Sequence, residues 1–294
     1  MDGDGRWPVQ VSGHHVGHCG RSVLADAAID FSQGVVFAFI LAIVRCRFQR
    51  GGQSPAQPLY GAVESLSLPL FLLDTRTLRD PRRASTLDSA SLLGDAQDAA
   101  LRRWLLAQPR KRPKLIVSPG ILLPRHRWAL RARLAEGVED TGDGAALASD
   151  SWDGYPQTLY SLLAFIAEND LQGVVFLSGD EHRGLCATAR IHGEGHSVTV
   201  HSVHTPGLNT PYRFANARDA DFVAEERIDF ERIADDGQRS EWRCEVETRA
   251  FEGAGFTQLR LQRESGQWSL HCEFDNDEQI PPEQRRWSVR LGEA

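Results

Sequence analysis

A short apolar run at residues 173–177, Gly-Val-Val-Phe-Leu, constrains the fold most, because Ser-Gly-Asp-Glu-His follows it directly at residues 178–182. A brief apolar stretch with β-branched residues is typical of a strand buried on both faces of a parallel sheet. In open α/β sheets, ligands bind beyond the carboxyl ends of such strands. The sequence therefore predicts an α/β fold with its chemistry at residues 178–182.

Asp180 and His182 are the candidate functional residues of this segment. The glycine at position 179 lets the backbone turn sharply, and the two side chains offer a carboxylate oxygen and an imidazole nitrogen two residues apart. Such donors suit a divalent or trivalent metal ion. Two ligands alone do not make a metal site. The alternative therefore stays open that Asp180 caps the next element and His182 packs nearby.

Three further motifs precede this segment. An apolar strand pattern ends in Asp-Thr-Arg at residues 74–76, Leu-Gly-Asp-Ala-Gln at 93–97 opens a helical pattern, and Trp-Asp-Gly-Tyr-Pro stands at 152–156. In this order, and followed by Ser-Gly-Asp-x-His, they resemble the C-terminal half of the alkaline phosphatase D (PhoD-like) metallophosphoesterases. The resemblance covers residues 69–218. No one of these motifs is decisive, but four in the right order are specific.

The resemblance implies a partial metallophosphoesterase-like sandwich that hydrolyses phosphate esters with a metal-activated water. Asp180 and His182 carry over as metal ligands, and His182 and Arg76 as catalytic residues. The metal would be Ca, Fe, Mn or Zn, and the partner a phosphate-ester substrate.

The family's other metal ligands lie in Gly-Asp-x-x-Tyr and in Asp-Asp-His or Asn-Asp-His motifs, none of which occurs in this sequence. We therefore expect a truncated member with an incomplete metal site. The alternative is an inactive remnant, or a binding module, on the same scaffold. We also expect that residues 1–60 do not rebuild the missing half of the site.

Arg76 has two possible roles. An arginine at the carboxyl end of a strand can hold a phosphate through two parallel hydrogen bonds. Alternatively, Asp74 and Arg76 pair with each other's neighbours and fix the loop. Within the third motif, we expect Asp153 to shape the loop before a helix, and Trp152 and Tyr155 to act as packing anchors.

Two groups of histidines need interpretation. His201 and His204 end an alternating strand, and one of them either reaches the metal site or the substrate phosphate, or is a buried histidine with a satisfied hydrogen bond. The second interpretation is favoured. The histidines at positions 14, 15 and 18, with the cysteine at 19, could bind a metal, but such clusters more often bind metal adventitiously.

The remaining patterns predict three units: an atypical segment at 1–60, the phosphoesterase half at 61–220, and a β-rich extension at 221–294. Apolar runs and helical stripes predict the following elements in the second unit: strands at 68–73, 114–117 and 174–177, and helices at 97–107, 125–135 and 157–167. Alternating patterns then predict antiparallel strands at 197–204, 241–248, 256–261 and 268–274. We expect the first three strands to be neighbours in one sheet.

Composition excludes several classes of protein. The net charge of −7, with no basic stripe, argues against a nucleic-acid partner. The basic residues at 110–114 are expected to form a solvated turn. The apolar segment 34–44 is a strand or a helix, too short to span a bilayer, which takes roughly 20 residues. Five cysteines without metal-like spacing, and no basic signal-peptide region, favour a reducing, cytoplasmic location.

Overall fold

The computed structural model describes residues 35–36, 58–63, 68–124, 149, 151–179, 183–206, 226–233, 237–251, 253, 255–275 and 281–292. Within these ranges the chain forms two β-sheets, two α-helices and three short 3-10 helices. The 3-10 helices are η1 (Ala84–Thr86), η2 (Trp152–Gly154) and η4 (Pro282–Gln284).

The first half of the larger sheet is parallel. It contains β3 (Leu70–Leu72), β4 (Lys114–Val117), β5 (Val174–Ser178) and β7 (His196–His204), which pair in that order. The outer strand β2 (Gly61–Val63) is antiparallel to β3. The prediction that the first three strands are neighbours in one sheet is therefore confirmed, and β5, with every residue buried, lies in the interior of the sheet.

The second half of this sheet is antiparallel. β6 (Gly184–Gly193) follows β5 in the chain, but it pairs with β7, on the side of β7 away from β5. A tight turn joins β6 to β7, and in it Glu194 and Gly195 have φ angles of 50° and 80°. β9 (Arg239–Phe251) pairs with β6, and β8 (Glu226–Ile233) pairs with β9. The full order is β2-β3-β4-β5-β7-β6-β9-β8. Two strands from the predicted C-terminal extension thus join the larger sheet, while the division at residue 220 stays a prediction.

The smaller sheet is antiparallel throughout. It consists of β1 (Val35–Val36), β10 (Phe256–Glu264), β11 (Gln267–Asp275) and β12 (Arg286–Leu291), paired in that order. The alternating patterns in the sequence predicted β10 and β11 correctly.

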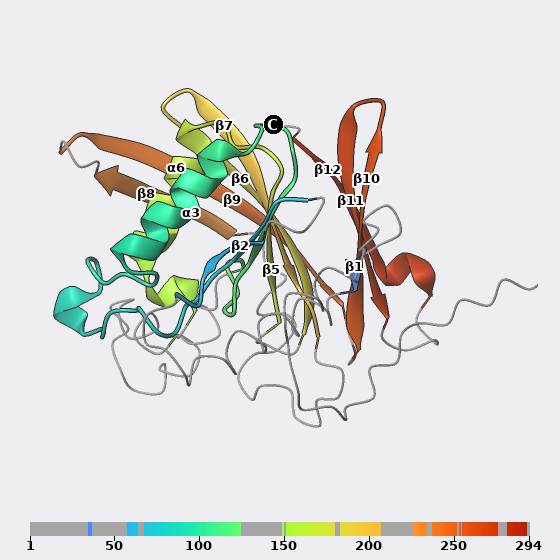
Figure 1. Cartoon of the computed structure of the whole chain (residues 1–294), viewed down its shortest axis with the longest axis horizontal. Helices are drawn as coiled ribbons and strands as arrows, with labels where there is room; N and C mark the ends of the chain where they lie inside the picture. The colour runs from blue at the N-terminus through green and yellow to red at the C-terminus, as the bar shows by residue number, and fades with distance from the viewer. Residues whose placement is uncertain are drawn as a thin grey trace, which may run out of the picture.

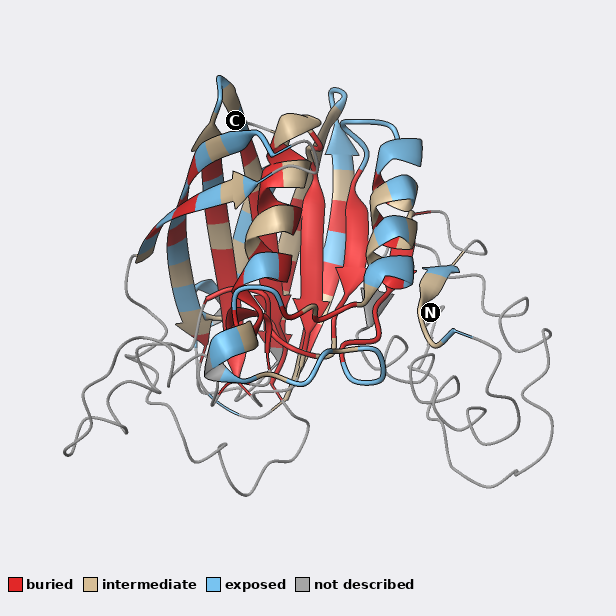
Figure 2. Cartoon of the chain, turned by 90° about the vertical axis from the view of Figure 1, so that its left-hand side faces the viewer, coloured by how far each residue is buried: buried red, intermediate tan, exposed pale blue. Residues whose placement is uncertain are grey.

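Two helices cover one face of the larger sheet, α3 (Asp95–Ala107) and α6 (Pro156–Glu168) (Figure 1). Each carries the predicted apolar stripe, and stripe residues such as Leu101 and Leu159 are fully buried. The proline at the first position of α6 suits a helix start, because its fixed φ is helical and its missing N–H has no partner there. Figure 2 shows central strands that are mostly buried, behind helices that are exposed on their outward faces.

The alternation of side chains along the strands feeds two hydrophobic cores. On β5, Val174 and Phe176 lie in the core shared with the helices, whereas Val175 and Leu177 lie in the core shared with the smaller sheet. The elements therefore form three layers: helices, larger sheet and smaller sheet (Figure 1). The fold is a mixed, sheet-rich α/β structure.

The two sheets approach closely where β9 ends. Phe251 of β9 stacks on Phe274 of β11 with ring centroids 3.9 Å apart. Gly184, the first residue of β6, lies against the same two residues, and a Cβ there would come within 2.9 Å of the Phe274 ring and 3.0 Å of the Phe251 carbonyl oxygen. A glycine is needed at the start of β6 for this reason.

The expectation of a solvated basic turn is wrong for Lys114. Its side chain is buried, and its Nζ lies 2.8–3.0 Å from the carbonyl oxygens of Pro109, Arg110, Arg112 and Gln172. Burial lowers the pKa of this amine from 10.5 to about 8. Lys114 thus ties the turn after α3 to the segment before β5.

Several expectations fall outside the described residues. They are the helix at 125–135, the apolar segment beyond β1, and the histidine cluster at 14–18. No helix among the described residues is both long enough and apolar enough to cross a membrane.

Candidate functional site

Buried polar side chains collect where the parallel strands end. Because β3, β4, β5 and β7 run in one direction, their carboxyl ends share one edge of the sheet. Asp74 follows β3, Ser118 follows β4, Ser178 ends β5 and His204 ends β7, and each is at most 2% exposed. Burying a polar group is unfavourable unless it is hydrogen-bonded. This edge is therefore organised by specific polar contacts.

Asp74 fixes the loop that carries Arg76. Its Oδ1 accepts hydrogen bonds from the backbone N–H groups of Arg76 and Thr77, both at 2.9 Å. This arrangement is a side-chain turn of the kind that aspartate favours. The predicted loop-fixing role is confirmed for Asp74. The Arg76 side chain is exposed, and its role in binding phosphate stays a prediction.

Gln97, in the first turn of α3, holds Asp74 from the other side. Its Oε1 accepts from the Asp74 N–H at 2.7 Å, and its Nε2 donates to the Asp74 carbonyl oxygen at 2.8 Å. The side-chain amide thus makes the two hydrogen bonds that the backbone of a neighbouring strand would make. The Asp-Thr-Arg and Leu-Gly-x-x-Gln motifs are two parts of one structural unit, which the sequence analysis missed. The available signal was an uncharged amide on the buried face of an amphipathic helix.

Trp152 ties the third motif to the same edge. Its indole Nε1 donates to Ser118 Oγ at 2.9 Å, and its ring packs edge-on against Phe176 of β5 at a centroid distance of 6.0 Å. Tyr155 is also buried, and its hydroxyl donates to the carbonyl oxygen of Asp80 at 3.1 Å. The prediction that both residues are packing anchors is confirmed, and each also makes a specific hydrogen bond.

Asp153 bonds within its own loop, as predicted. The Ser149 hydroxyl donates to its Oδ1 and accepts from the backbone N–H of Ser151. Asp153 is 2% exposed, and its Oδ2 has no hydrogen-bond partner among the described residues. Oδ2 of Asp153 is therefore a buried carboxylate oxygen that takes no part in the described hydrogen bonds of the loop.

His201 and His204 face opposite sides of the sheet. His204 Nδ1 lies 2.6 Å from Ser178 Oγ, which joins the ends of β7 and β5 on the helix-covered side. This is the buried, hydrogen-bonded histidine that was favoured. His201 instead packs toward the smaller sheet, with its ring centroid 5.8 Å from that of Trp287 and its Nδ1 3.2 Å from Thr188 Oγ1. Burial lowers the pKa of His201 from 6.5 to about 4.

The two predicted metal ligands, Asp180 and His182, lie outside the described residues. Their described neighbours are Gly179, directly after β5, and Arg183, buried directly before β6. Within the described ranges, no group of three or more His, Cys, Asp or Glu side chains could hold a metal ion. The roles of Asp180 and His182 stay predictions.

Comparison with known proteins identifies the family of the chain. The sequence model for the PhoD-like phosphatase family matches residues 55–253. The chain belongs to the PhoD-like phosphatase family. The match covers all four motifs and the strands whose carboxyl ends hold the buried polar groups. PhoD-like phosphatases are phosphoesterases, and they are metal-dependent in general.

Two further comparisons give less. No curated protein matches the chain. A solved structure described as "Structure of PhoD" aligns with a TM-score of 0.45 and 16% identity over 86% of this chain. The alignment covers 46% of that protein, so this chain spans less than half of its length.

Proposed function

We propose that this protein hydrolyses phosphate esters with a metal-activated water at the carboxyl edge of β3, β4, β5 and β7. One observation carries the proposal: the family motifs converge on this edge through buried hydrogen bonds. Gln97 grips the backbone of Asp74, Trp152 bonds Ser118, and His204 bonds Ser178. The smaller sheet, packed on the face of the larger sheet opposite the helices, is consistent with a metallophosphoesterase-like sandwich, which forms part of the proposal.

Asp180 and His182 are the proposed metal ligands, because they follow β5 at the edge where these contacts meet. A bound cation would lower the pKa of its water and offset the charge on the phosphoryl oxygens. The chain's own contribution is to position groups. The Asp74 carboxylate pins the loop of Arg76, and we assign the exposed Arg76 guanidinium to the phosphate oxygens, where two parallel hydrogen bonds fix orientation.

The metal site is proposed to need more ligands than these two. Even a single catalytic zinc takes three protein ligands, and sites with two metals take more. At the described edge, Oδ1 of Asp74 already accepts a hydrogen bond from its own loop. We therefore expect Asp180 and His182 alone to hold a metal weakly, and turnover of a generic ester by this chain to be slow.

The test is metal binding and turnover measured on the same preparations. Wild type, Asp180→Asn and His182→Ala would be titrated with Mn²⁺ by calorimetry and assayed with p-nitrophenyl phosphate and its diester. The matched control is His192→Ala, since the side chain of His192 lies on β6 in an exposed hydrogen bond with Ser197.

We expect both site variants to lose Mn²⁺ affinity and whatever slow turnover the wild type shows, and the control to keep both. Mn²⁺ binding that neither site variant changes would assign the metal to other residues. Robust turnover abolished by His182→Ala would show that the site is complete. Metal-independent inertness of every form would favour a binding module on the same scaffold.

A further inference from the structure

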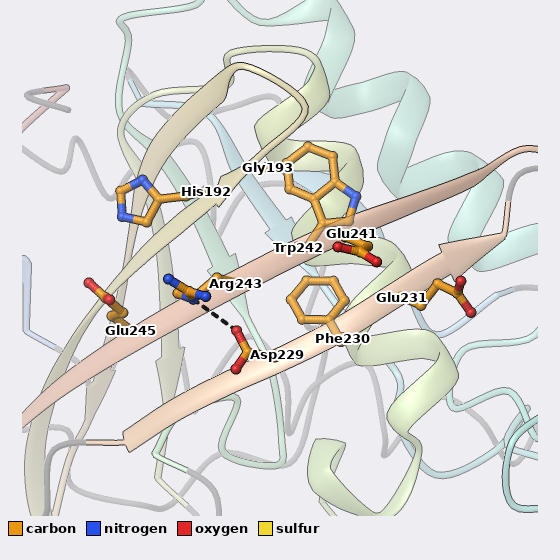
Figure 3. Close-up of a pocket in the computed structure, with 9 residues that line it drawn as sticks. All are labelled: His192, Gly193, Asp229, Phe230, Glu231, Glu241, Trp242, Arg243 and Glu245. Atoms are coloured by element: carbon orange, nitrogen blue, oxygen red, sulfur yellow. Dashed lines mark hydrogen bonds and ion pairs between the residues drawn. The ribbon is translucent and has the colours of Figure 1, made fainter.

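Among the described residues, strand β8 forms an edge of the larger sheet. Its one strand partner there is β9, so no described strand pairs with the N–H and C=O groups on its other side. It runs for 8 residues, which is long for an exposed edge, since such edges are commonly kept short. Figure 3 shows β8, with Asp229, Phe230 and Glu231, along the border of the sheet beside β9.

The two faces of β8 differ in character. Ile228 and Phe230 are buried on the helix-covered face, where Phe230 stacks on Tyr160 with centroids 4.7 Å apart. Arg227, Asp229 and Glu231 are exposed on the other face. Edges are often protected by charged side chains, especially lysine, by proline or by a bulge. β8 has no lysine or proline, and its charges are of both signs, in the order Glu-Arg-Ile-Asp-Phe-Glu-Arg-Ile.

An acidic pair lies beside this edge. Glu231 of β8 is directly opposite Glu241 of β9, and like charges in that position repel. Arg239 lies 3.0 Å from Glu231, but Glu241 has no ion partner among the described residues. Both glutamates line a groove of about 700 Å³ over β6, β8 and β9 (Figure 3). The groove has room for a further positively charged side chain.

The sequence of β8 complements itself in one register. When β8 pairs with β8 of a second copy about a two-fold axis perpendicular to the sheet, each residue lies opposite one whose side chain is on the same face. Two registers meet this condition and pair seven residues of the strand, either 226–232 or 227–233. With Asp229 at the centre, Arg227 meets Glu231, Glu226 meets Arg232, and the apolar residues 228 and 230 meet each other. With Phe230 at the centre, Asp229 meets Glu231 twice. The first register is favoured by charge.

The centre of that register tolerates two facing aspartates. Each Asp229 already has two arginine neighbours in its own chain, Arg227 at 3.1 Å and Arg243 at 2.8 Å. Figure 3 draws the pair with Arg243. Four guanidinium groups would thus surround two carboxylates. The same arrangement brings the partner's arginine at 227 to Glu231, beside Glu241, which has no ion partner in the described part of the chain.

We propose that β8 pairs with β8 of a second copy of this chain, antiparallel and centred on Asp229. The two larger sheets then join into one continuous sheet, and each copy brings its residue 227 to Glu231 of the other, beside Glu241. This interface is separate from the carboxyl edge of the parallel strands and does not depend on the proposed function.

Charge reversal tests the interface. Sedimentation equilibrium of the wild type should show a monomer–dimer equilibrium at micromolar concentrations. Arg227→Glu sets like charges against Glu231 at two symmetric places and should weaken association about tenfold or more; Glu231→Arg should act likewise. The double variant Arg227→Glu with Glu231→Arg reverses both members of each pair and should restore association toward the wild-type value.

The matched control is Arg190→Glu, which breaks an exposed ion pair with Glu247 at 3.0 Å between β6 and β9, away from the edge. It should leave association unchanged, and a circular dichroism spectrum would confirm that each variant is folded. A wild type that stays monomeric up to millimolar concentration overturns the proposal. A dimer that both single reversals leave intact also overturns it, because another surface must then hold the copies together.

Discussion

The two halves of the larger sheet are built on different principles. In the parallel half, β5 is buried at every position and its polar neighbours are tied by buried hydrogen bonds. In the antiparallel half, β8 and β9 alternate between buried and exposed residues, and exposed ion pairs cover one face. The first half holds polar groups rigidly at one edge, which suits chemistry. The second exposes charged groups along β8, a strand with one strand partner among the described residues, which suits association.

The largest expected difference between the halves concerns Gln97. Gln97→Leu would leave the backbone N–H and C=O of Asp74 buried without partners, and we expect the free energy of unfolding to fall by about 4 kcal/mol. Urea denaturation monitored by tryptophan fluorescence would measure it. Gln97→Glu keeps the acceptor for the Asp74 N–H but loses the donor, and should fall in between. A loss below 1 kcal/mol for Gln97→Leu would mean that the buried amide is not needed to hold this edge.

The second-largest expected effect is a pH dependence of the stability, which comes from His201 where β7 contacts the smaller sheet. His201 has its pKa lowered to about 4 by burial, against 6.5 when unfolded. Between these values the unfolded state binds a proton that the folded state does not, so stability falls as the pH is lowered from 6.5 to 4, by about 3 kcal/mol at most. Unfolding curves at a series of pH values would measure this slope.

Replacing His201 with glutamine should remove that part of the slope. The same substitution at His192, whose hydrogen bond with Ser197 is exposed, controls for the change of residue type. An equal slope in the His201 variant and the wild type would assign the acid sensitivity to other groups.

A smaller effect is expected at Trp152. Trp152→Phe keeps most of the packing against Phe176 but removes the hydrogen bond to Ser118. We expect a loss of about 1.5 kcal/mol, measured by thermal unfolding. Trp268→Phe on β11, where the ring is partly exposed, is the comparison and should lose less. The reverse order would contradict the assignment of rigidity to the parallel edge.

The smallest change in the free energy of unfolding is expected in the antiparallel half. Arg190→Ala removes an ion pair with Glu247 whose side chains are 48% and 60% exposed. Exposed pairs contribute little, so the free energy of unfolding should change by less than about 0.5 kcal/mol. A loss comparable with that of Gln97→Leu, in the same denaturation experiment, would erase the distinction between the halves.

The sequence was most informative where one physical effect dominates. The apolar runs of β3, β4 and β5, and the stripes of α3 and α6, predicted these elements because burial alone sets their pattern. β8 was missed because five of its eight residues are charged, which resembles a solvated loop until pairing with β9 is known.

The polar contacts of the candidate site were harder to predict. Lys114 was misplaced because a lysine among exposed basic residues is seldom buried, and only the fold brings four carbonyl oxygens around it. The grip of Gln97 on Asp74 joins residues 23 positions apart, which no local pattern encodes. Asp180 and His182 were proposed from their motif and place after a strand, and their roles stay predictions.

The most direct test of the account is to locate a bound metal relative to the two halves. Mn²⁺ broadens the nuclear magnetic resonance signals of nearby protons, and indole N–H signals can be assigned by replacing each tryptophan. Trp152 marks the carboxyl edge of the parallel strands, and Trp242 marks β9 in the antiparallel half. The account predicts that substoichiometric Mn²⁺ broadens the Trp152 signal, leaves Trp242 sharp, and loses this selectivity in His182→Ala. Selective broadening of Trp242, or equal broadening of both, would contradict it.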